Sequence, residues 1–143
     1  MLPEAIELVI VTPTRQLLRA RTNEVSLPGA NGYLGILPGH APLMTELGIG
    51  ELAFQGAPQG APLAIVRGFA EVLPDRVTVL AETAELAAEI DLERAEAAKA
   101  RAEKRLAASA TDIDWDRASV ALQRALIRIQ VARKFRGVSA NAR

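Results

Sequence analysis

Several residue types are scarce in this chain of 143 residues. It has no cysteine, which excludes disulfides, thiolate zinc sites and a cysteine nucleophile. Its single histidine leaves almost no material for a histidine-rich metal site or a serine triad. Aromatic residues make up only 3% of a chain that is 50% hydrophobic, so the core must be aliphatic. We therefore expect no catalytic residue, no metal ligand and no required cofactor.

Charge and hydropathy exclude further classes of protein. The formal net charge is zero, so no overall field attracts the chain to nucleic acid. No apolar run approaches the roughly 20 residues that a membrane-spanning helix needs. The stretch from Met1 to Glu4 carries no signal or transit pattern and leads directly into a β-rich segment. We expect a soluble protein that stays in the compartment where it is made.

Glycine and proline concentrate in one segment, Leu27 to Gly50, which holds six of the ten glycines and three of the eight prolines. Pro28-Gly29 and Pro38-Gly39 each suit a type II turn, because proline fixes the first φ and glycine accepts the second, positive φ. The segment therefore predicts two turns that bracket a short strand, Tyr33–Leu37. Either these are plain turns, or their accessible backbone N–H groups contact another surface.

Phosphate binding and catalysis by this segment are both disfavoured. Its glycines follow the pattern G-x-x-G-x-x-G, and no Lys-Ser/Thr pair follows, so it is not a phosphate-binding loop. Pro38 and Pro42 also prevent a helix from opening nearby. His40 is more readily explained as a hydrogen-bonded structural group than as a catalyst.

Short strands are expected through most of the first half. Ile6, Leu8 and Ile10 alternate onto one face, as in a half-buried strand. The other expected strands, besides Glu4–Thr12, are Gln16–Arg21, Asn23–Leu27, Glu51–Phe54, Leu63–Arg67, Phe69–Leu73 and Val77–Ala81. Their spacing, with glycine and proline between them, predicts a β-sandwich of short antiparallel strands.

The composition changes after Ala84, where alanine, arginine and glutamate come to dominate, a mixture that favours helices. All prolines lie at or before Pro74. We place the domain boundary near Glu85 to Ile90. The predicted division is a β-sandwich domain at 1–87, a helical hairpin at 88–136 and a flexible tail at 137–143.

The helical part contains an internal repeat, because the pattern of Ile90–Ala95 returns at Ile113–Ala118. Asp91 and Asp114 are each well placed as an N-cap, and the isoleucine before each can pack on the alanine four residues into the helix. The repeat predicts helices from about Leu92 to Ala108 and from about Trp115 to Arg133. The short link, Ser109 to Asp112, favours an antiparallel hairpin.

The apolar stripes of the two helices are narrow. They comprise Leu92, Ala95, Ala102 and Leu106 on the first helix, and Trp115, Leu122, Leu126 and Ile129 on the second. Such alanine-rich stripes bury little apolar area, so we expect a marginally stable hairpin that needs a partner surface.

Arginines gather on both helices. Arg94, Arg101 and Arg105 share a face of the first, and Arg124 and Arg128 share a face of the second. In an antiparallel hairpin Arg94 would approach Arg128, and Arg101 would approach Arg124. Converging arginines need a carboxylate or an anion, and a phosphate chain would serve. The alternative is a solvated face with the side chains in water.

The end of the chain is basic, with seven basic residues and no acidic residue after Asp116. Such a helix can dock on an acidic protein, an anionic membrane or nucleic acid. It lacks the bulky aromatics of a membrane binder and an aromatic ladder for bases. An acidic protein partner is the best of the three.

Four motifs together resemble the epsilon subunit of bacterial-type F-type ATP synthases, over nearly the whole chain. They are the loop Leu34–Leu43 (LGILPGHAPL), the strands Gly68–Val72 and Val77–Ala81, and the Ile-Asp-x-x-Arg-Ala start of the hairpin at Ile90–Ala95. The resemblance implies an N-terminal β-sandwich and a C-terminal two-helix domain within the rotating central stalk. It also implies a peripheral place on the cytoplasmic face of the bacterial inner membrane, with membrane contact only through the complex.

The resemblance implies partners as well: the gamma subunit, the c-ring and the catalytic alpha/beta head, with no nucleic acid. In the family the hairpin either folds down or extends into the head, where it inhibits ATP hydrolysis. The implied contact loop for the c-ring and gamma comprises Gly29, Tyr33, Gly35, Pro38, Gly39, His40 and Pro42. Tyr33 stands where many relatives have an acidic residue, which changes the detail of the c-ring contact.

Some bacterial members bind ATP with the folded hairpin, so the resemblance implies ATP as a regulatory ligand. The candidate residues are Glu85, Ile90, Asp91, Arg94, Ala95, Arg101, Arg124 and Arg128. Because the repeat at Ile113 shows that the motif also serves as a plain helix start, the arginines carry more weight than the motif.

Two rival functions come from other classes. One is a stand-alone ligand-binding β-sandwich with a helical dimerisation tail, which would be found free of any membrane complex. The other is an enzyme, and it is the weakest, because capping explains the paired carboxylates Asp112 and Asp114.

Overall fold

Seven strands precede two helices in the computed structural model, which describes residues 1–108 and 110–141, with the side chains of 59 and 138–141 left aside. The strands are β1 (Ile6–Val11), β2 (Gln16–Thr22), β3 (Val25–Gly29), β4 (Gly32–Ile36), β5 (Leu43–Phe54), β6 (Leu63–Leu73) and β7 (Arg76–Leu86). The helices are α1 (Leu92–Ala108) and α2 (Asp112–Asn141), and the short 3₁₀ turns are η1 (Pro58–Gly60) and η2 (Ala87–Glu89).

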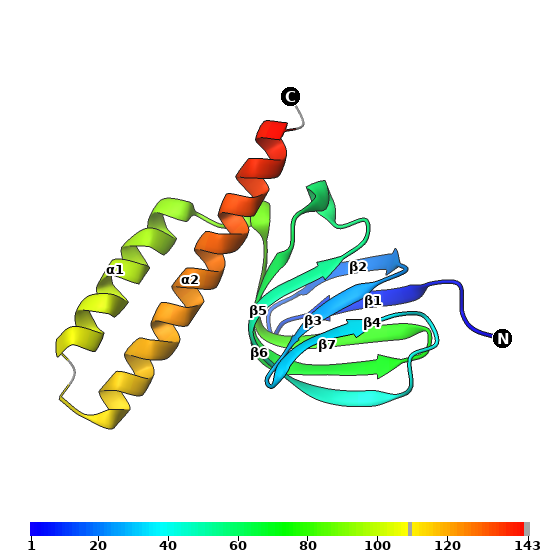
Figure 1. Ribbon diagram of the computed structural model, residues 1–143, viewed down its shortest axis with the longest axis horizontal. Helices are drawn as coiled ribbons and strands as arrows, with labels where there is room; N and C mark the ends of the chain where they lie inside the picture. Colours follow the sequence, from blue (N-terminus) through cyan, green and yellow to red (C-terminus); the bar gives the residue numbers. More distant parts are fainter. Residues whose placement is uncertain (109, 142–143) are drawn as a thin grey trace.

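The strands form one sheet in the order β2-β1-β7-β6-β5-β3-β4, which bends over itself into a β-sandwich (Figure 1). Neighbouring strands are antiparallel except β1 and β7, which run parallel. Ile6, Leu8 and Ile10 point inward as predicted, and each is fully buried. The interior is almost entirely aliphatic, with Phe54 as its aromatic member. The predicted β-sandwich followed by a helical hairpin is confirmed.

Three strands are longer than predicted. The 12 residues of β5 extend through Gly48 and Gly50, which the sequence assigned to a loop. A single strand, β6, replaces the two predicted segments at 63–67 and 69–73, and it stays in register with β7 across Gly68. The backbone bends there, with φ of 52° at Arg67 and 136° at Gly68. The end of β7 at Leu86 places Glu85 in the sheet.

The two predicted proline–glycine turns have different outcomes. At Pro38-Gly39 the turn is confirmed, since Gly39 has φ of 86° and the His40 N–H donates to the Leu37 carbonyl at 3.1 Å. At Pro28-Gly29 the prediction is wrong, because both residues lie inside β3. The chain turns after them instead, and a Cβ on Gly29 would lie 2.5 Å from the Gly32 oxygen. This glycine therefore provides space rather than a positive φ.

The first helix has the predicted bounds and the predicted cap. The Arg94 N–H donates to Asp91 Oδ1 at 3.1 Å, and Ile90 packs in the same buried cluster as Ala95. Thus the local signals at Ile90–Ala95 act as an N-cap and a hydrophobic staple.

The second helix starts earlier and ends later than predicted. Thr111, rather than Asp114, is the N-cap, because Thr111 Oγ1 accepts a hydrogen bond from the Asp114 N–H at 3.1 Å. Ile113 is 64% exposed and forms no staple. Of the tail predicted at 137–143, residues 137–141 continue α2, and 142–143 lie outside the described residues.

Figure 1 shows α2 lying between α1 and the sandwich. The predicted stripe of α1 is confirmed at Leu92, Ala95 and Ala102, which are buried, whereas Leu106 is half-buried. The predicted stripe of α2 is wrong at Trp115 and Leu126, which are exposed. A helix with two neighbours has two contact faces, so a search for one apolar stripe selects the wrong residues. The buried residues of α2 are Ala118, Ala125, Ile127, Ile129, Val131 and Ala132.

Gly68→Ala tests the bend in β6. A Cβ at Gly68 would collide with the Leu80 carbonyl oxygen, and its φ is one that other residues rarely adopt. We expect a loss of roughly 2 kcal/mol or more in the free energy of unfolding, measured by urea denaturation. Gly35→Ala is the matched control, because a Cβ there meets nothing within 4 Å. Equal stability of the two variants would contradict this account of the bend.

Candidate functional site

The side of α2 that faces the sandwich combines an apolar centre with polar flanks. Ile127 and Val131 are buried there, in a cluster with Ala61 and Ala64 of the sandwich and with Ala87 of η2. This cluster is separate from the core between the strands. Small alanines let the helix approach closely, so the sandwich provides the partner surface that the hairpin was expected to need.

A row of three residues crosses the sheet beneath α2. Glu51 of β5 pairs in register with Ala64 of β6, which in turn pairs with Glu85 of β7. Residues in register share a face of the sheet, so two carboxylates flank one methyl group. We call this row the acidic saddle: Glu51, Ala64 and Glu85.

Arg128 holds the β7 side of the acidic saddle. Its Nη2 donates to Glu85 Oε2 at 3.2 Å, and its buried Nε lies 2.9 Å from Glu85 Oε1 in an ionic contact that is not a hydrogen bond. Both side chains are largely shielded, with exposed fractions of 23% and 28%. One turn earlier, Arg124 approaches Glu82 at 3.9 Å, where both side chains are open to water. Of these two ion pairs, the first is therefore the stronger.

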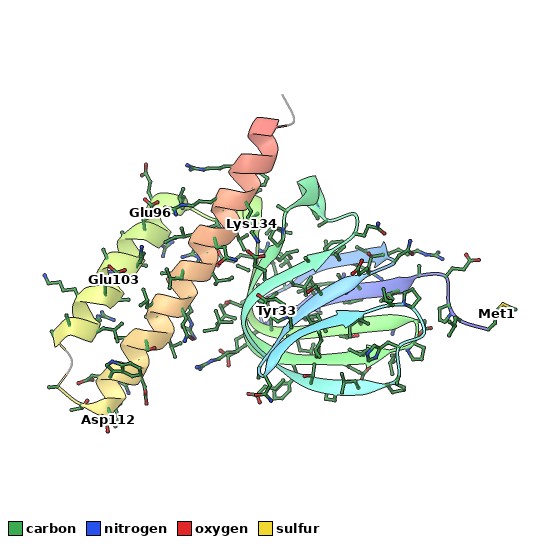
Figure 2. The ribbon with its side chains drawn as sticks, in the orientation of Figure 1. Met1, Tyr33, Glu96, Glu103, Asp112 and Lys134 are labelled. Atoms are coloured by element: carbon green, nitrogen blue, oxygen red, sulfur yellow. The ribbon has the colours of Figure 1, made fainter. Side chains whose placement is uncertain are left out.

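Two residues of α2 hold the β5 side. Gln130 Nε2 donates to Glu51 Oε1 at 2.6 Å, and Lys134 Nζ donates to Glu51 Oε2 at 2.8 Å. The Glu51 side chain is only 12% exposed. At 100° per residue, Gln130 and Lys134 lie on one side of the Ile127–Val131 ridge, and Arg128 lies on the other. Polar contacts therefore hold the helix to the sheet on both sides of the apolar ridge. Lys134 is labelled in Figure 2.

The connection between β7 and α1 is tied to the loop between β1 and β2. Arg15 Nη2 donates to Glu89 Oε2 at 2.8 Å, and the same oxygen accepts from the Leu86 N–H at 3.3 Å. The Arg15 hydrogen bond is the main cause that lowers the pKa of Glu89 below its ordinary value. Glu89 therefore joins η2, directly before α1, to the loop between β1 and β2.

The residues predicted to bind ATP fall into three groups. Glu85 and Arg128 contact each other directly. Ile90, Asp91, Arg94 and Ala95 form the start of α1, where Ile90 and Ala95 are buried and Asp91 is the cap. Arg101 and Arg124 are exposed on separate helices. Arg124 and Arg128 turn toward β7 carboxylates, so protein groups already supply the counter-charge that the sequence assigned to an anion.

The predicted contact loop lies at two places. Gly29, Tyr33 and Gly35 belong to the β3–β4 hairpin, whereas Pro38, Gly39, His40 and Pro42 connect β4 to β5. His40 Nδ1 lies 2.7 Å from the Ala41 carbonyl oxygen, which fits the structural role expected of it. Several large apolar side chains around these turns are exposed: Tyr33, Leu37, Leu43 and Met44.

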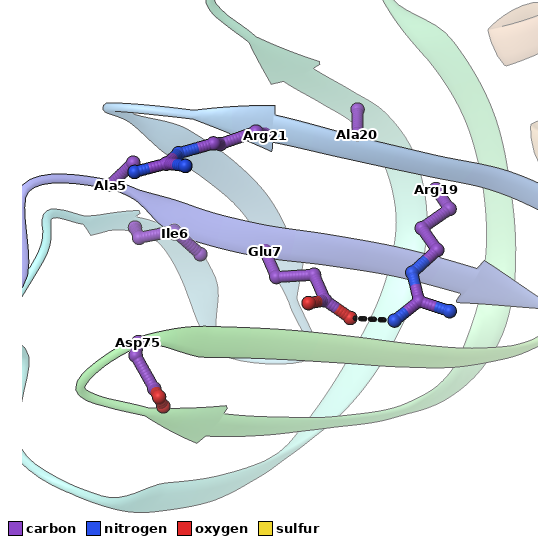
Figure 3. Close-up of a pocket in the computed structure, with 7 residues that line it drawn as sticks. All are labelled: Ala5, Ile6, Glu7, Arg19, Ala20, Arg21 and Asp75. Carbon is purple, nitrogen blue, oxygen red and sulfur yellow. Dashed lines mark hydrogen bonds and ion pairs between the residues drawn. The ribbon is translucent and has the colours of Figure 1, made fainter.

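A second set of exposed groups lies on the outer face of β1, β2, β6 and β7. Phe69 and Leu80 are cross-strand partners and are each 54% exposed. At the far end of this face is a hollow of about 420 Å³, where Glu7 lies 2.7 Å from Arg19 Nη2 (Figure 3). Arg76 also reaches Glu7 at 3.4 Å, so surface ion pairing accounts for these charges.

Within residues 1–108 and 110–141, no cluster of three acidic, histidine or cysteine residues suited to a metal ion occurs. Over the same residues, neither helix combines the length and the hydropathy needed to cross a bilayer.

Sequence reasoning missed Glu51, Gln130 and Lys134 as contact residues. Their only signal was polarity, which surface residues share. The basic character of α2 did predict an acidic protein surface, and part of that surface proves to lie on the chain's own sheet.

Comparison with known proteins gives a consistent result. Residues 5–87 match the family model "ATP synthase, Delta/Epsilon chain, beta-sandwich domain", and residues 88–133 match "ATP synthase, Delta/Epsilon chain, long alpha-helix domain". The chain is 47% identical over 131 residues to the ATP synthase epsilon chain of Syntrophobacter fumaroxidans, covering 92% of this chain and 98% of that one. It is 48% identical over 132 residues to that of Geobacter sulfurreducens, covering 92% and 96%.

Two solved structures share the fold. One is a chain of the Euglena gracilis mitochondrial ATP synthase (OSCP/F1/c-ring), with a TM-score of 0.74 at 23% identity, covering 86% of this chain and 78% of that chain. The other is a chain of the Tetrahymena thermophila mitochondrial ATP synthase (central stalk/c-ring), with a TM-score of 0.54 at 14% identity, covering 90% and 94%.

Arg128→Ala and Arg124→Ala form a matched pair that tests the grip on the β7 side. Loss of the shielded Arg128 leaves Glu85 without its partner, and we expect about 2 kcal/mol less stability. Loss of the open Arg124 contact should cost at most about 0.5 kcal/mol. Urea denaturation at neutral pH measures both. Equal losses in the free energy of unfolding would show that shielding from water does not distinguish the two ion pairs.

Proposed function

Because the chain belongs to the ATP synthase delta/epsilon family as an epsilon subunit of an F-type ATP synthase, we propose a role in the central stalk. There it links the gamma subunit to the c-ring of a proton-translocating enzyme and restrains ATP hydrolysis through α1 and α2. Its role is regulatory and structural, without catalysis of its own. In a bacterium it would lie at the cytoplasmic face of the inner membrane, held there by the complex.

The observation that carries the restraining role is the chemistry of α2's docked face. The helix holds the sandwich by ion pairs at its flanks and by a narrow apolar ridge at its centre. Ionic contacts of this kind are exchangeable, because another acidic surface can replace the carboxylates of the sheet as the partners of the helix. A helix held in this way can leave the sandwich and present its basic side to an acidic loop of the catalytic head.

The exposed apolar side chains of the sandwich support the stalk contacts. Leu37, Leu43 and Met44 surround the Pro38-Gly39 turn at one end of the sandwich. Phe69 and Leu80 expose a second apolar surface on an outer face. Exposed apolar groups gathered in this way are typical of protein contacts. We assign the first set to the c-ring side and the second to the gamma side.

ATP is the proposed regulatory ligand of the docked hairpin. Helical periodicity places Arg94, Arg101, Arg124 and Arg128 along one edge of the hairpin, opposite the edge where Arg133 pairs with Glu96 at 3.3 Å. A phosphate chain along the first edge would draw the two helices together. The nucleotide would then stabilise the docked state and relieve inhibition.

The family assignment favours the stalk subunit over a stand-alone ligand-binding sandwich with a dimerisation tail. The docked position of α2 also removes the need for a second copy, because the chain's own sheet covers the helix.

Truncation after Ala88 in the assembled enzyme tests the restraining role. The sandwich keeps its own core without the helices, so we expect assembly to persist. ATP hydrolysis should rise several-fold relative to enzyme with the full-length subunit, measured by phosphate release under identical loading. Complexes that fail to assemble would contradict this division of labour, and unchanged hydrolysis would contradict inhibition.

ATP binding can be followed through Trp115, which is 52% exposed at the start of α2. We expect a saturable fluorescence change when ATP is added to the full chain, lost in Arg124→Ala and Arg128→Ala. Arg136→Ala, at an exposed position on the same helix, is the control and should bind normally. If calorimetry and fluorescence are both flat for the unaltered protein, ATP is not the ligand.

A further inference from the structure

The tyrosine of the β3–β4 hairpin reaches the backbone of the acidic saddle. Tyr33 extends from β4 across β3, and its Oη accepts a hydrogen bond from the Glu51 N–H at 3.0 Å. Figure 2 labels Tyr33 in this region of the sandwich. An exposed side chain in the predicted contact loop is therefore bonded to a residue that grips α2.

A break in the β3–β5 ladder makes this bond possible. Ser26 pairs with Ala53, but the next residue of β5 that pairs with β3 is Leu47, opposite Gly29. The residues of β5 between Leu47 and Ala53 outnumber those of β3, so the strand bulges and the Glu51 N–H has no partner in β3. An unpaired backbone N–H needs an acceptor, and the Tyr33 hydroxyl provides one.

Gly50 provides the space for this arrangement. A Cβ at Gly50 would lie 2.7 Å from both Tyr33 Oη and the Pro28 Cβ. Gly50 has no positive φ, so a close approach accounts for glycine at this position. The tyrosine ring therefore packs directly against β5 at Gly50.

The same residue, Glu51, therefore carries two contacts on two sides. Its N–H is held by Tyr33 within the sheet, and its carboxylate accepts from Gln130 and Lys134 of α2. A side chain that is mostly shielded and held at both oxygens has little freedom to follow a shifted backbone. A shift of the Glu51 backbone at the Tyr33 bond would therefore strain the carboxylate's contacts with Gln130 and Lys134.

We propose that Tyr33 is a positioning residue for Glu51, so that a partner that displaces the Tyr33 hydroxyl weakens the docking of α2. This inference rests on the proposed function, because it presumes a hairpin that leaves the sandwich. It adds a route for that regulation: contact at Tyr33 passes through one hydrogen bond to Glu51 and on to Lys134.

A double-mutant cycle in the full chain tests the route. The chain has no cysteine. Spin labels can therefore be placed on cysteines introduced at two exposed positions, Asn23 of the sandwich and Ala107 of α1. Pulsed electron paramagnetic resonance then measures the distance between the two labels. The sizes of the two distance populations give the ratio of open to docked hairpin. Glu51→Lys should raise this ratio about tenfold, and adding Lys134→Glu should bring it back, because the swapped pair restores the attraction.

Tyr33→Phe removes a single oxygen and should raise the ratio about threefold. In a Glu51→Gln background, Tyr33→Phe should raise the ratio little further, because the coupling between Tyr33 and Lys134 passes through the Glu51 carboxylate. Glu46→Gln is the matched control on β5, because its exposed side chain faces no ion-pair partner among the described residues. It should leave the ratio unchanged.

The outcomes separate the two ideas. If Glu51→Lys opens the hairpin but Tyr33→Phe leaves the ratio unchanged, or acts equally in the Glu51→Gln background, the positioning role of Tyr33 is refuted while the movable hairpin stands. If no variant produces a second distance, even Glu51→Lys combined with Arg128→Ala, both the positioning role and the movable hairpin fail. Glu51 then only stabilises a fixed interface.

Discussion

One helix, α2, must satisfy two neighbours at once, and the arrangement of the C-terminal half depends on how it does so. Toward the sheet it presents Ile127 and Val131 with polar residues on both flanks, and toward α1 it presents mainly alanines. The helix has two separate contact faces, so no single broad apolar face holds it. Its attachment to the sandwich is instead a sum of small apolar contacts and charged ones.

Zero net charge conceals a strong segregation of charge. The basic residues of α2 meet acidic residues of β5 and β7, so the two surfaces neutralise each other when the helix is docked. Under the proposed function, release would expose an acidic sheet and a basic helix together. The sheet would then compete with any acidic partner for the same helix. The balance between the docked and released states would depend on how well the acidic saddle is formed, rather than on the helix alone.

Local signals in the sequence predicted the elements they control. Asp91 fixed the start of α1, and the Pro38-Gly39 dipeptide gave the expected turn, because each acts within a few residues. Gly50 was assigned to a loop, because nothing near it in the sequence explains a glycine within a strand. The explanation is the close approach of the Tyr33 ring, which comes from another strand. The contact between Glu51 and Lys134 joins positions 83 residues apart. No periodicity reports such a pair, so the arginines of α2 were predictable but the pairing of the helix with Glu51 and Glu85 of the sheet was not.

The seam between α1 and α2 is filled largely by alanine, with Ala95 and Ala102 on one helix and Ala118, Ala125 and Ala132 on the other. An alanine methyl group offers other proteins little apolar surface for contact. Leucine or phenylalanine at these positions would leave an exposed apolar stripe on each separated helix. If the helices separate as the proposed function requires, the exposed alanines would give other proteins little apolar surface on which to aggregate. Its small side chains favour safe exposure to water over tight cohesion.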